Sequence, residues 1–241
     1  MFRLGKGLLC ALIIVELSFA SEVEFPRQRF DAQAPRWMEN VANIEVPAIK
    51  HEQGRARHYT EYCSGTLLKN AKASEPRFVI SAWHCVEHYQ DLSRDLTVYF
   101  PHAQSHRKVY TARLVDSGGS ISSDWALLKL SEAPSSEQLA GLALMTTDKN
   151  QPATAAGFAL ALPNGRQRLS FDDSCKANGE NEWILCTTSK GASGGPIVQI
   201  HQSMAGIVGV ISQGDSEAFT ISFPSARLPQ RWKGAFGAHL L

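Results

Sequence analysis

Apolar residues along this chain fall in short runs, and long stretches with a helical period are scarce. The runs are rich in β-branched and aromatic residues and lie at positions 44–49, 78–82, 96–100, 125–130, 197–200 and 207–211. Turn-forming residues separate them, as at Gly118-Gly119 and Asn178-Gly179. Short strands divided by such turns predict an all-β sandwich or barrel. Helical patterns are confined to residues 34–42 and to residues 227–232 near the end of the chain.

The first twenty residues have the pattern of a secretory signal peptide. Arg3 and Lys6 precede the apolar run 7–15, and small residues before and at Ala20 suit a cleavage site. The run is too short to span a bilayer. We therefore expect residues 1–20 to be removed, leaving a secreted or periplasmic protein with no membrane attachment. Residues 21–43 are expected to form either a propeptide or an ordered N-terminal arm.

Composition narrows the choice of partners. The chain has 241 residues and a formal net charge of +1, so bulk charge gives no reason to expect a nucleic-acid or membrane partner. Its length suits one domain or two small ones, and the polar stretch 131–138 is the best candidate for a connection between two halves. No repeat, metal or organic cofactor is indicated. We expect a monomer.

Four cysteines remain once the signal peptide, with its Cys10, is removed. They are Cys63, Cys85, Cys175 and Cys186, an even number that suits disulfide bonds in an oxidising compartment. Four cysteines allow three pairings, and the spacing alone does not choose among them. The spacing also lacks the short cysteine pairs of a structural zinc site.

The strongest chemical signal is the segment Gly191-Ala192-Ser193-Gly194-Gly195-Pro196. A serine hydroxyl is a weak nucleophile that needs a base for its proton and hydrogen-bond donors for the developing oxyanion. A glycine two residues before the serine lets its own N–H and the serine N–H point into one hollow. Glycines after the serine give the turn an open steric path. The segment therefore predicts a nucleophilic serine.

Two further residues complete a catalytic set. His84 stands at the end of the apolar run 78–82, and a neutral imidazole is well suited to accept a proton near pH 7. Asp124 opens the run 125–130, where a partly buried carboxylate needs a partner such as a histidine N–H. Their order along the chain, His, Asp, Ser, is one of the known triad orders.

Five segments together resemble the signature blocks of chymotrypsin/trypsin-like serine peptidases, with a pattern closest to bacterial secreted trypsin-like and glutamyl-endopeptidase-like members. They lie at residues 63–68, 81–85, 124–128, 191–196 and 209–214. The resemblance implies two antiparallel six-stranded β-barrels, at residues 44–133 and 134–241, with the active site in the cleft between them. It implies a serine endopeptidase acting on protein or peptide substrates. A short C-terminal helix completes the expected fold.

The resemblance also implies roles for single residues. Ser193 would attack the scissile carbonyl, His84 would act as general base and acid, and Asp124 would orient the imidazole. The N–H groups of Gly191 and Ser193 would form the oxyanion hole. The implied disulfides join Cys63 to Cys85 and Cys175 to Cys186. The positions that would bind substrate are Thr187, Thr188, Lys190, Ile211, Ser212, Gln213 and Gly214.

Several positions depart from the familiar members. Ala192 replaces the aspartate that pairs with a new N-terminus in digestive zymogens, so that activation switch is expected to be absent. Thr187 stands where trypsin-like enzymes carry aspartate, and Ile211 where glutamyl endopeptidases carry histidine. Gln213 replaces the usual aromatic residue. We therefore expect a preference for uncharged side chains at the cleavage site.

Three other functions stay open at this point. His84-Cys85-Val86-Glu87-His88 matches an H-x-x-E-H zinc-peptidase pattern, although this pattern specifies only three positions. A catalytically silent homologue that binds a partner is the second alternative, because Ala192 and Gln213 both depart from the family pattern. An esterase with the same triad would share the chemistry.

Overall fold

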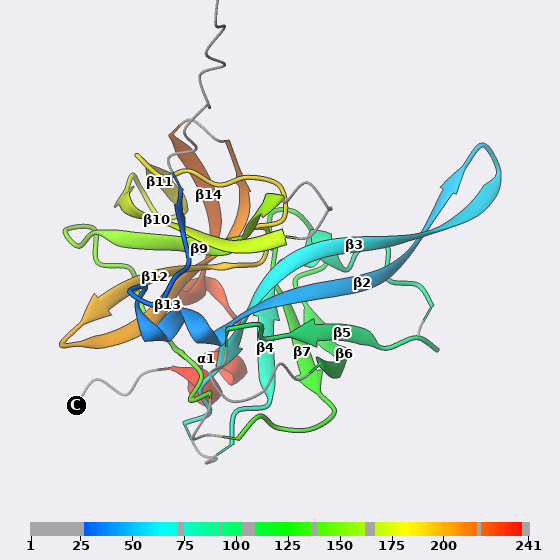
Figure 1. Cartoon of the computed structure of the whole chain (residues 1–241), viewed down its shortest axis with the longest axis horizontal. Coiled ribbons are helices and arrows are strands. Elements are labelled where there is room, and N and C mark those ends of the chain that lie inside the picture. Colours follow the sequence, from blue (N-terminus) through cyan, green and yellow to red (C-terminus); the bar gives the residue numbers. More distant parts are fainter. Residues whose placement is uncertain are drawn as a thin grey trace, which may run out of the picture.

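The computed structural model describes residues 27–71, 75–91, 93–102, 109–135, 139–161, 167–215 and 218–237. The predicted signal peptide and residues 21–26 lie outside the described residues. Strands dominate, and they form two closed barrels that lie side by side (Figure 1). No helix in these ranges is long and apolar enough to cross a membrane.

The first barrel closes in the order β2-β3-β4-β7-β6-β5. Its strands are β2 (Val41–Glu52), β3 (Arg55–Leu68), β4 (Phe78–Ser81), β5 (Leu96–Tyr99), β6 (Val109–Ser117) and β7 (Ala126–Leu130). All neighbours are antiparallel, and β5 pairs with both β2 and β6 to complete the ring. Inward side chains such as Val46, Leu96 and Leu128 are fully buried. The outer half of the β2–β3 hairpin extends well beyond the barrel (Figure 1).

The second barrel forms a ring in the order β9-β10-β11-β14-β13-β12, closed by pairing of β9 with both β10 and β12. Its strands are β9 (Ala153–Ala161), β10 (Gln167–Ala177), β11 (Glu182–Ile184), β12 (Pro196–His201), β13 (Met204–Gly214) and β14 (Phe219–Pro224). The short strand β8 (Ala143–Leu144) adds to β13 in parallel. These two rings confirm the predicted all-β class and the two six-stranded barrels.

A further apolar core lies between the barrels. It combines Ile80 and Leu127 of the first barrel with Ile207 and Phe223 of the second, all of them buried. The helix α1 (Gln230–Phe236) follows the 3-10 turn η3 (Ser225–Arg227) and packs its aromatic face on Phe78 of β4. The C-terminal helix, which the sequence predicted, thus fastens the end of the second barrel to the first.

Residues before the first barrel run along the second one, as the dark blue trace shows (Figure 1). The strand β1 (Gln28–Arg29) pairs with β10, and the 3-10 helix η1 (Arg36–Asn40) buries Met38 against Phe158 and Leu169. These contacts make residues 27–40 an ordered arm on the outside of the second barrel.

Candidate active site

His84 and Asp124 are brought together by the pairing of β4 with β7. Ser81, the last residue of β4, lies opposite Ala126, the first residue of β7. His84 follows β4 in the short 3-10 turn η2 (Trp83–Cys85), and Asp124 precedes β7 by two residues. The antiparallel register therefore places both side chains at one end of the first barrel, although they are 40 residues apart.

Asp124 accepts three hydrogen bonds at this point. Its Oδ2 lies 2.8 Å from His84 Nδ1 and also accepts from the Ser212 hydroxyl, while its Oδ1 accepts the His84 backbone N–H at 2.9 Å. The Asp124 side chain is buried and the imidazole is about one-quarter exposed. Burial alone would raise the pKa of Asp124, but the hydrogen bonds from His84 and Ser212 outweigh it and hold the pKa below its ordinary value. An ionised Asp124 fixes the imidazole with its Nδ1 proton turned inward.

Ser193 lies in the turn before β12, at the boundary between the barrels. The backbone N–H of Ser64, on β3, donates to the Ser193 carbonyl at 2.8 Å. The same carbonyl lies 3.8 Å from Cys85 Sγ, next to His84. Within the described residues, the Ser193 hydroxyl has no hydrogen-bond partner. The side chain is therefore unengaged beside the histidine turn.

The turn around Ser193 leaves two N–H groups unpaired. The N–H groups of Gly194 and Gly195 are bonded at 2.8 Å to neighbouring carbonyls, whereas those of Gly191 and Ser193 find no acceptor in the described ranges. Gly191 has φ +97°, and a Cβ there would lie only 2.4 Å from the Phe158 carbonyl. Glycine is required at this position for both conformation and space. The turn that carries Ser193 therefore has two backbone N–H donors with no acceptor among the described residues.

The other predicted substrate-binding residues lie on both sides of this turn. Thr187 and Thr188 are buried in the segment before it, while Lys190 is exposed. Ile211 on β13 is buried and exchanges backbone hydrogen bonds with Gly194 and Gly195 at 2.8 Å. The remaining predicted positions continue along β13; of these, Ser212 is buried against Asp124, and Gln213 and Gly214 are exposed.

Two disulfides are present among the described residues, with the pairing that the resemblance implied. Cys63 on β3 is bonded to Cys85 in η2, which ties the histidine turn to the first barrel. Cys175 on β10 is bonded to Cys186, just before Thr187. Each bridge thus anchors a segment that leads into the candidate site.

We expect loss of the first bridge to be more costly than loss of the second. The Cys63–Cys85 bond spans 22 residues and the other spans 11, and in the chain-entropy model a loop of the longer size stabilises by about 3 kcal/mol. Urea denaturation of the Cys63→Ala/Cys85→Ala protein should show that the free energy of unfolding falls by an amount of that order. The Cys175→Ala/Cys186→Ala protein is the control, and its free energy of unfolding should fall by less. An unchanged free energy of unfolding in the first variant would contradict this.

The zinc alternative finds no support in the geometry. The segment His84–His88 forms a 3-10 turn and a further turn, where the pattern needs an α-helix. His84 faces Asp124, Cys85 is in a disulfide, and His88 Nε2 lies 3.3 Å from its neighbour Glu87. In the ranges that the structure describes, no three His, Cys, Asp or Glu side chains come together to hold a metal.

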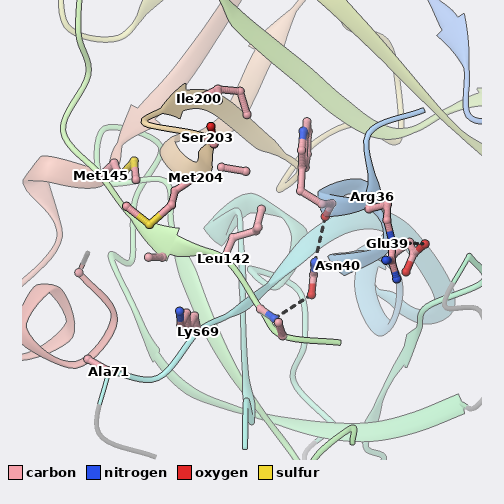
Figure 2. Close-up of a pocket in the computed structure, with 16 residues that line it drawn as sticks. Arg36, Glu39, Asn40, Lys69, Ala71, Leu142, Met145, Ile200, Ser203 and Met204 are labelled. Carbon is pink, nitrogen blue, oxygen red and sulfur yellow. Dashed lines mark hydrogen bonds and ion pairs between the residues drawn. The ribbon is translucent and has the colours of Figure 1, made fainter. Parts of the chain in front are cut away.

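A groove of about 710 Å³ on the surface contains none of these residues. It lies between η1, the stretch before β8 and the β12–β13 turn, with Leu142, Ile200 and Met204 along it (Figure 2). Asn40 lines the groove, where its side-chain oxygen accepts the Gly141 N–H at 2.8 Å and its side-chain nitrogen donates to the Trp37 carbonyl at 3.0 Å. It is separate from the candidate active site.

Several polar residues that hydrogen-bond to the segments around the candidate site were not predicted from the sequence. Ser64 bridges the barrels, since its hydroxyl donates to the Gly191 carbonyl at 2.7 Å and accepts the Phe158 N–H at 2.8 Å. Arg27 and Asp172 are buried on either side of Thr187. Ser64 lies inside one of the family-like segments, whereas nothing in the local sequence marks Arg27 or Asp172.

Comparisons with known proteins bear on the fold and the family of this chain. The chain is similar to the protease Anisep from Arthrobacter nicotinovorans, with a TM-score of 0.56 and 16% identity over 77% of this chain and 90% of that chain. At that identity the likeness establishes the fold, a chymotrypsin-like protease fold. No curated protein matches the chain. A model of the lysyl endopeptidase C-terminal domain family matches residues 33–224, which is most of the chain. The chain therefore belongs to this peptidase family, that of the lysyl endopeptidase C-terminal domain.

Proposed function

We propose that this protein is a secreted serine endopeptidase that hydrolyses peptide bonds through an acyl-enzyme intermediate. The observation that carries the proposal is the bonded series Ser212–Asp124–His84, placed beside a serine turn with two unpaired N–H groups. Membership of a peptidase family supports a peptide substrate. The N-terminal signal pattern and two disulfides support export.

Each residue has a defined task in the reaction. Ser193 Oγ forms a bond to the scissile carbonyl carbon as its proton passes to His84 Nε2, and the carbonyl oxygen becomes an oxyanion. The N–H groups of Gly191 and Ser193 donate to that oxyanion. The C–N bond then breaks, the leaving amine takes the proton from His84, and an acyl-serine remains. Water, activated by His84, hydrolyses this ester and restores the enzyme.

Asp124 acts through the imidazole. Its carboxylate accepts the Nδ1 proton, which leaves Nε2 free to act as a base, and its charge stabilises the imidazolium that forms. The Ser212 hydroxyl and the His84 N–H hold the carboxylate in place. Because its pKa is lowered, Asp124 stays ionised through the neutral range.

An inhibitor comparison tests the proposal. Casein hydrolysis by the mature protein should be abolished by a serine-directed fluorophosphonate and unaffected by a zinc chelator, because no metal takes part. Loss of activity with the chelator alone would favour the H-x-x-E-H metallopeptidase. A folded protein with neither hydrolysis nor labelling would favour the silent homologue.

A further inference from the structure

The two segments that flank the substrate site are bonded directly to each other. One is the stretch Cys186–Lys190 before the nucleophile turn, and the other is the end of β13 with the described residues Asp215 and Ala218. The Thr188 N–H donates to the Asp215 carbonyl at 2.9 Å, and the Cys186 N–H donates to the Ala218 carbonyl at 3.1 Å. Backbones paired in this way lie about 5 Å apart. That spacing leaves no slot for a large side chain between them.

Threonine hydroxyls fill the space beneath Gly214. A Cβ on Gly214 would lie 1.9 Å from Thr188 Oγ1 and 3.1 Å from Thr220 Oγ1. The Thr220 hydroxyl donates to the Cys186 carbonyl at 2.9 Å and lies 3.2 Å from Thr188 Oγ1. Thr187, Thr188 and Thr220 are each 3% exposed or less. The part of the floor that these residues form is therefore shallow, and its own side chains are uncharged.

Thr187, at one side of this floor, is held by two buried charged residues. Its N–H and hydroxyl both donate to Asp172 Oδ2, at 2.8 and 2.6 Å. Its carbonyl accepts from the guanidinium of Arg27. Arg27 comes from the N-terminal arm and is 6% exposed, and Asp172 on β10 is 5% exposed. Hydrogen bonds to charged groups are stronger than neutral ones, so this peptide unit is firmly fixed.

Arg27 is itself fully engaged in the second barrel. Its remaining donors bond to the Ser170 hydroxyl at 3.0 Å, the Ser170 carbonyl at 2.8 Å and the Ala155 carbonyl at 3.2 Å. Burial lowers the pKa of Arg27 to about 10, and the negative charge of Asp172 partly opposes this. Arg27 is therefore a cation at neutral pH. A planar guanidinium carries several N–H donors in a fixed geometry, and this lets the single Arg27 side chain bond to all four of these acceptor atoms.

We propose that the substrate site takes a small uncharged side chain at the residue whose carbonyl is attacked, and that Arg27 is the positioning residue that keeps the site shallow by holding Thr187 against Asp172. This inference rests on the proposed peptidase function and adds its substrate class. It also requires that the mature enzyme keep the arm from Arg27 onward, because removal of Arg27 would leave a buried Asp172 without its cation.

Matched substrates test the substrate class. Peptide esters that differ only in alanine, phenylalanine or lysine at the attacked residue give kcat/KM values for the wild-type protein. We expect alanine to be favoured over both of the others by about tenfold or more. A wild-type preference for phenylalanine or lysine overturns this part of the proposal.

Substitution of Arg27 tests the positioning role. In Arg27→Gln the ratio of kcat/KM for alanine to that for phenylalanine should fall about tenfold. The reason is that Thr187 loses its hydrogen bond from the guanidinium, so the floor of the site can move to admit a larger side chain. Arg27→Lys, which keeps the charge, should restore part of the ratio. Arg29→Gln is the matched control, since Arg29 is an exposed neighbour on β1, and it should leave the ratio unchanged. A folded Arg27→Gln protein with the wild-type ratio overturns the role of Arg27.

Two further measurements separate this role from a general loss of structure. Asp172→Asn weakens the hydrogen bonds that Thr187 donates to Asp172, so it should lower the alanine-to-phenylalanine ratio as Arg27→Gln does. If Arg27→Gln does not fold, Asp172→Asn provides the test. A small fluorophosphonate without a peptide side chain should label Arg27→Gln within about threefold of the wild-type rate, whereas a general loss would lower labelling and selectivity together. If the wild-type protein is not labelled at all, the proposed function itself fails.

Discussion

Replacing Ser193 with alanine is expected to lower kcat for peptide hydrolysis by about a million-fold. In the proposed mechanism this hydroxyl forms the acyl-enzyme, and without it the N–H donors would accelerate only a direct attack by water. The fold should not change, because the Ser193 hydroxyl has no hydrogen-bond partner within the described residues and the turn is held by its backbone through Ser64. Steady-state hydrolysis of a peptide ester, with circular dichroism as the check on folding, gives the result.

The matched control is Ser189→Ala, which removes a hydroxyl four residues earlier in the same segment. The Ser189 hydroxyl donates to the Ala159 carbonyl at 3.1 Å. Its loss should change kcat by less than about tenfold. If Ser193→Ala were no more harmful than Ser189→Ala, Ser193 would not be the nucleophile.

Replacing Asp124 with asparagine is expected to lower kcat by about ten-thousand-fold with little change in KM. Asparagine has the same shape, so the backbone bond from His84 can persist at Oδ1. Its amide group would then face His84 Nδ1 and donate to it, which forces the imidazole proton onto Nε2. A protonated Nε2 cannot take the proton of Ser193. The variant would retain the site geometry with the wrong histidine tautomer.

Ser212→Ala provides the comparison for Asp124→Asn. It removes one of the three hydrogen bonds to the carboxylate and leaves both bonds to His84. We expect a far smaller loss of kcat, since the tautomer is unchanged. Equal losses in the two variants would mean that Asp124 does not act through the imidazole.

The strands that carry regular apolar runs were predictable from the sequence. The runs at 78–82 and 125–130 are strands β4 and β7, and their pairing builds the histidine and aspartate end of the site. Strand β6 was harder to predict because apolar and polar residues do not alternate regularly along it. Two of its valines face solvent, with Val109 58% exposed and Val115 43% exposed. Strand β10 carries many polar residues, because it buries Asp172 and Ser170 against the arm.

The catalytic candidates were predictable for a different reason, since each lies in a short local motif with its own steric demand. The supporting residues were not. Arg27 and Thr187 are 160 residues apart, and Phe158 and Ser64 are 94 apart. A buried arginine and an ordinary surface arginine look alike in sequence, and only the docking of the arm on β10 distinguishes Arg27 from Arg29. Long-range polar pairing of this kind needs the folded structure.

The proposed catalytic triad can be tested by locating a fluorophosphonate adduct in the mature protein by peptide mass spectrometry. We expect a single stoichiometric adduct on Ser193, absent from the Ser193→Ala protein and formed far more slowly in Asp124→Asn. An adduct on another residue, or none in a folded wild-type protein that still hydrolyses casein, would contradict the assignment of Ser193, His84 and Asp124 as the catalytic triad.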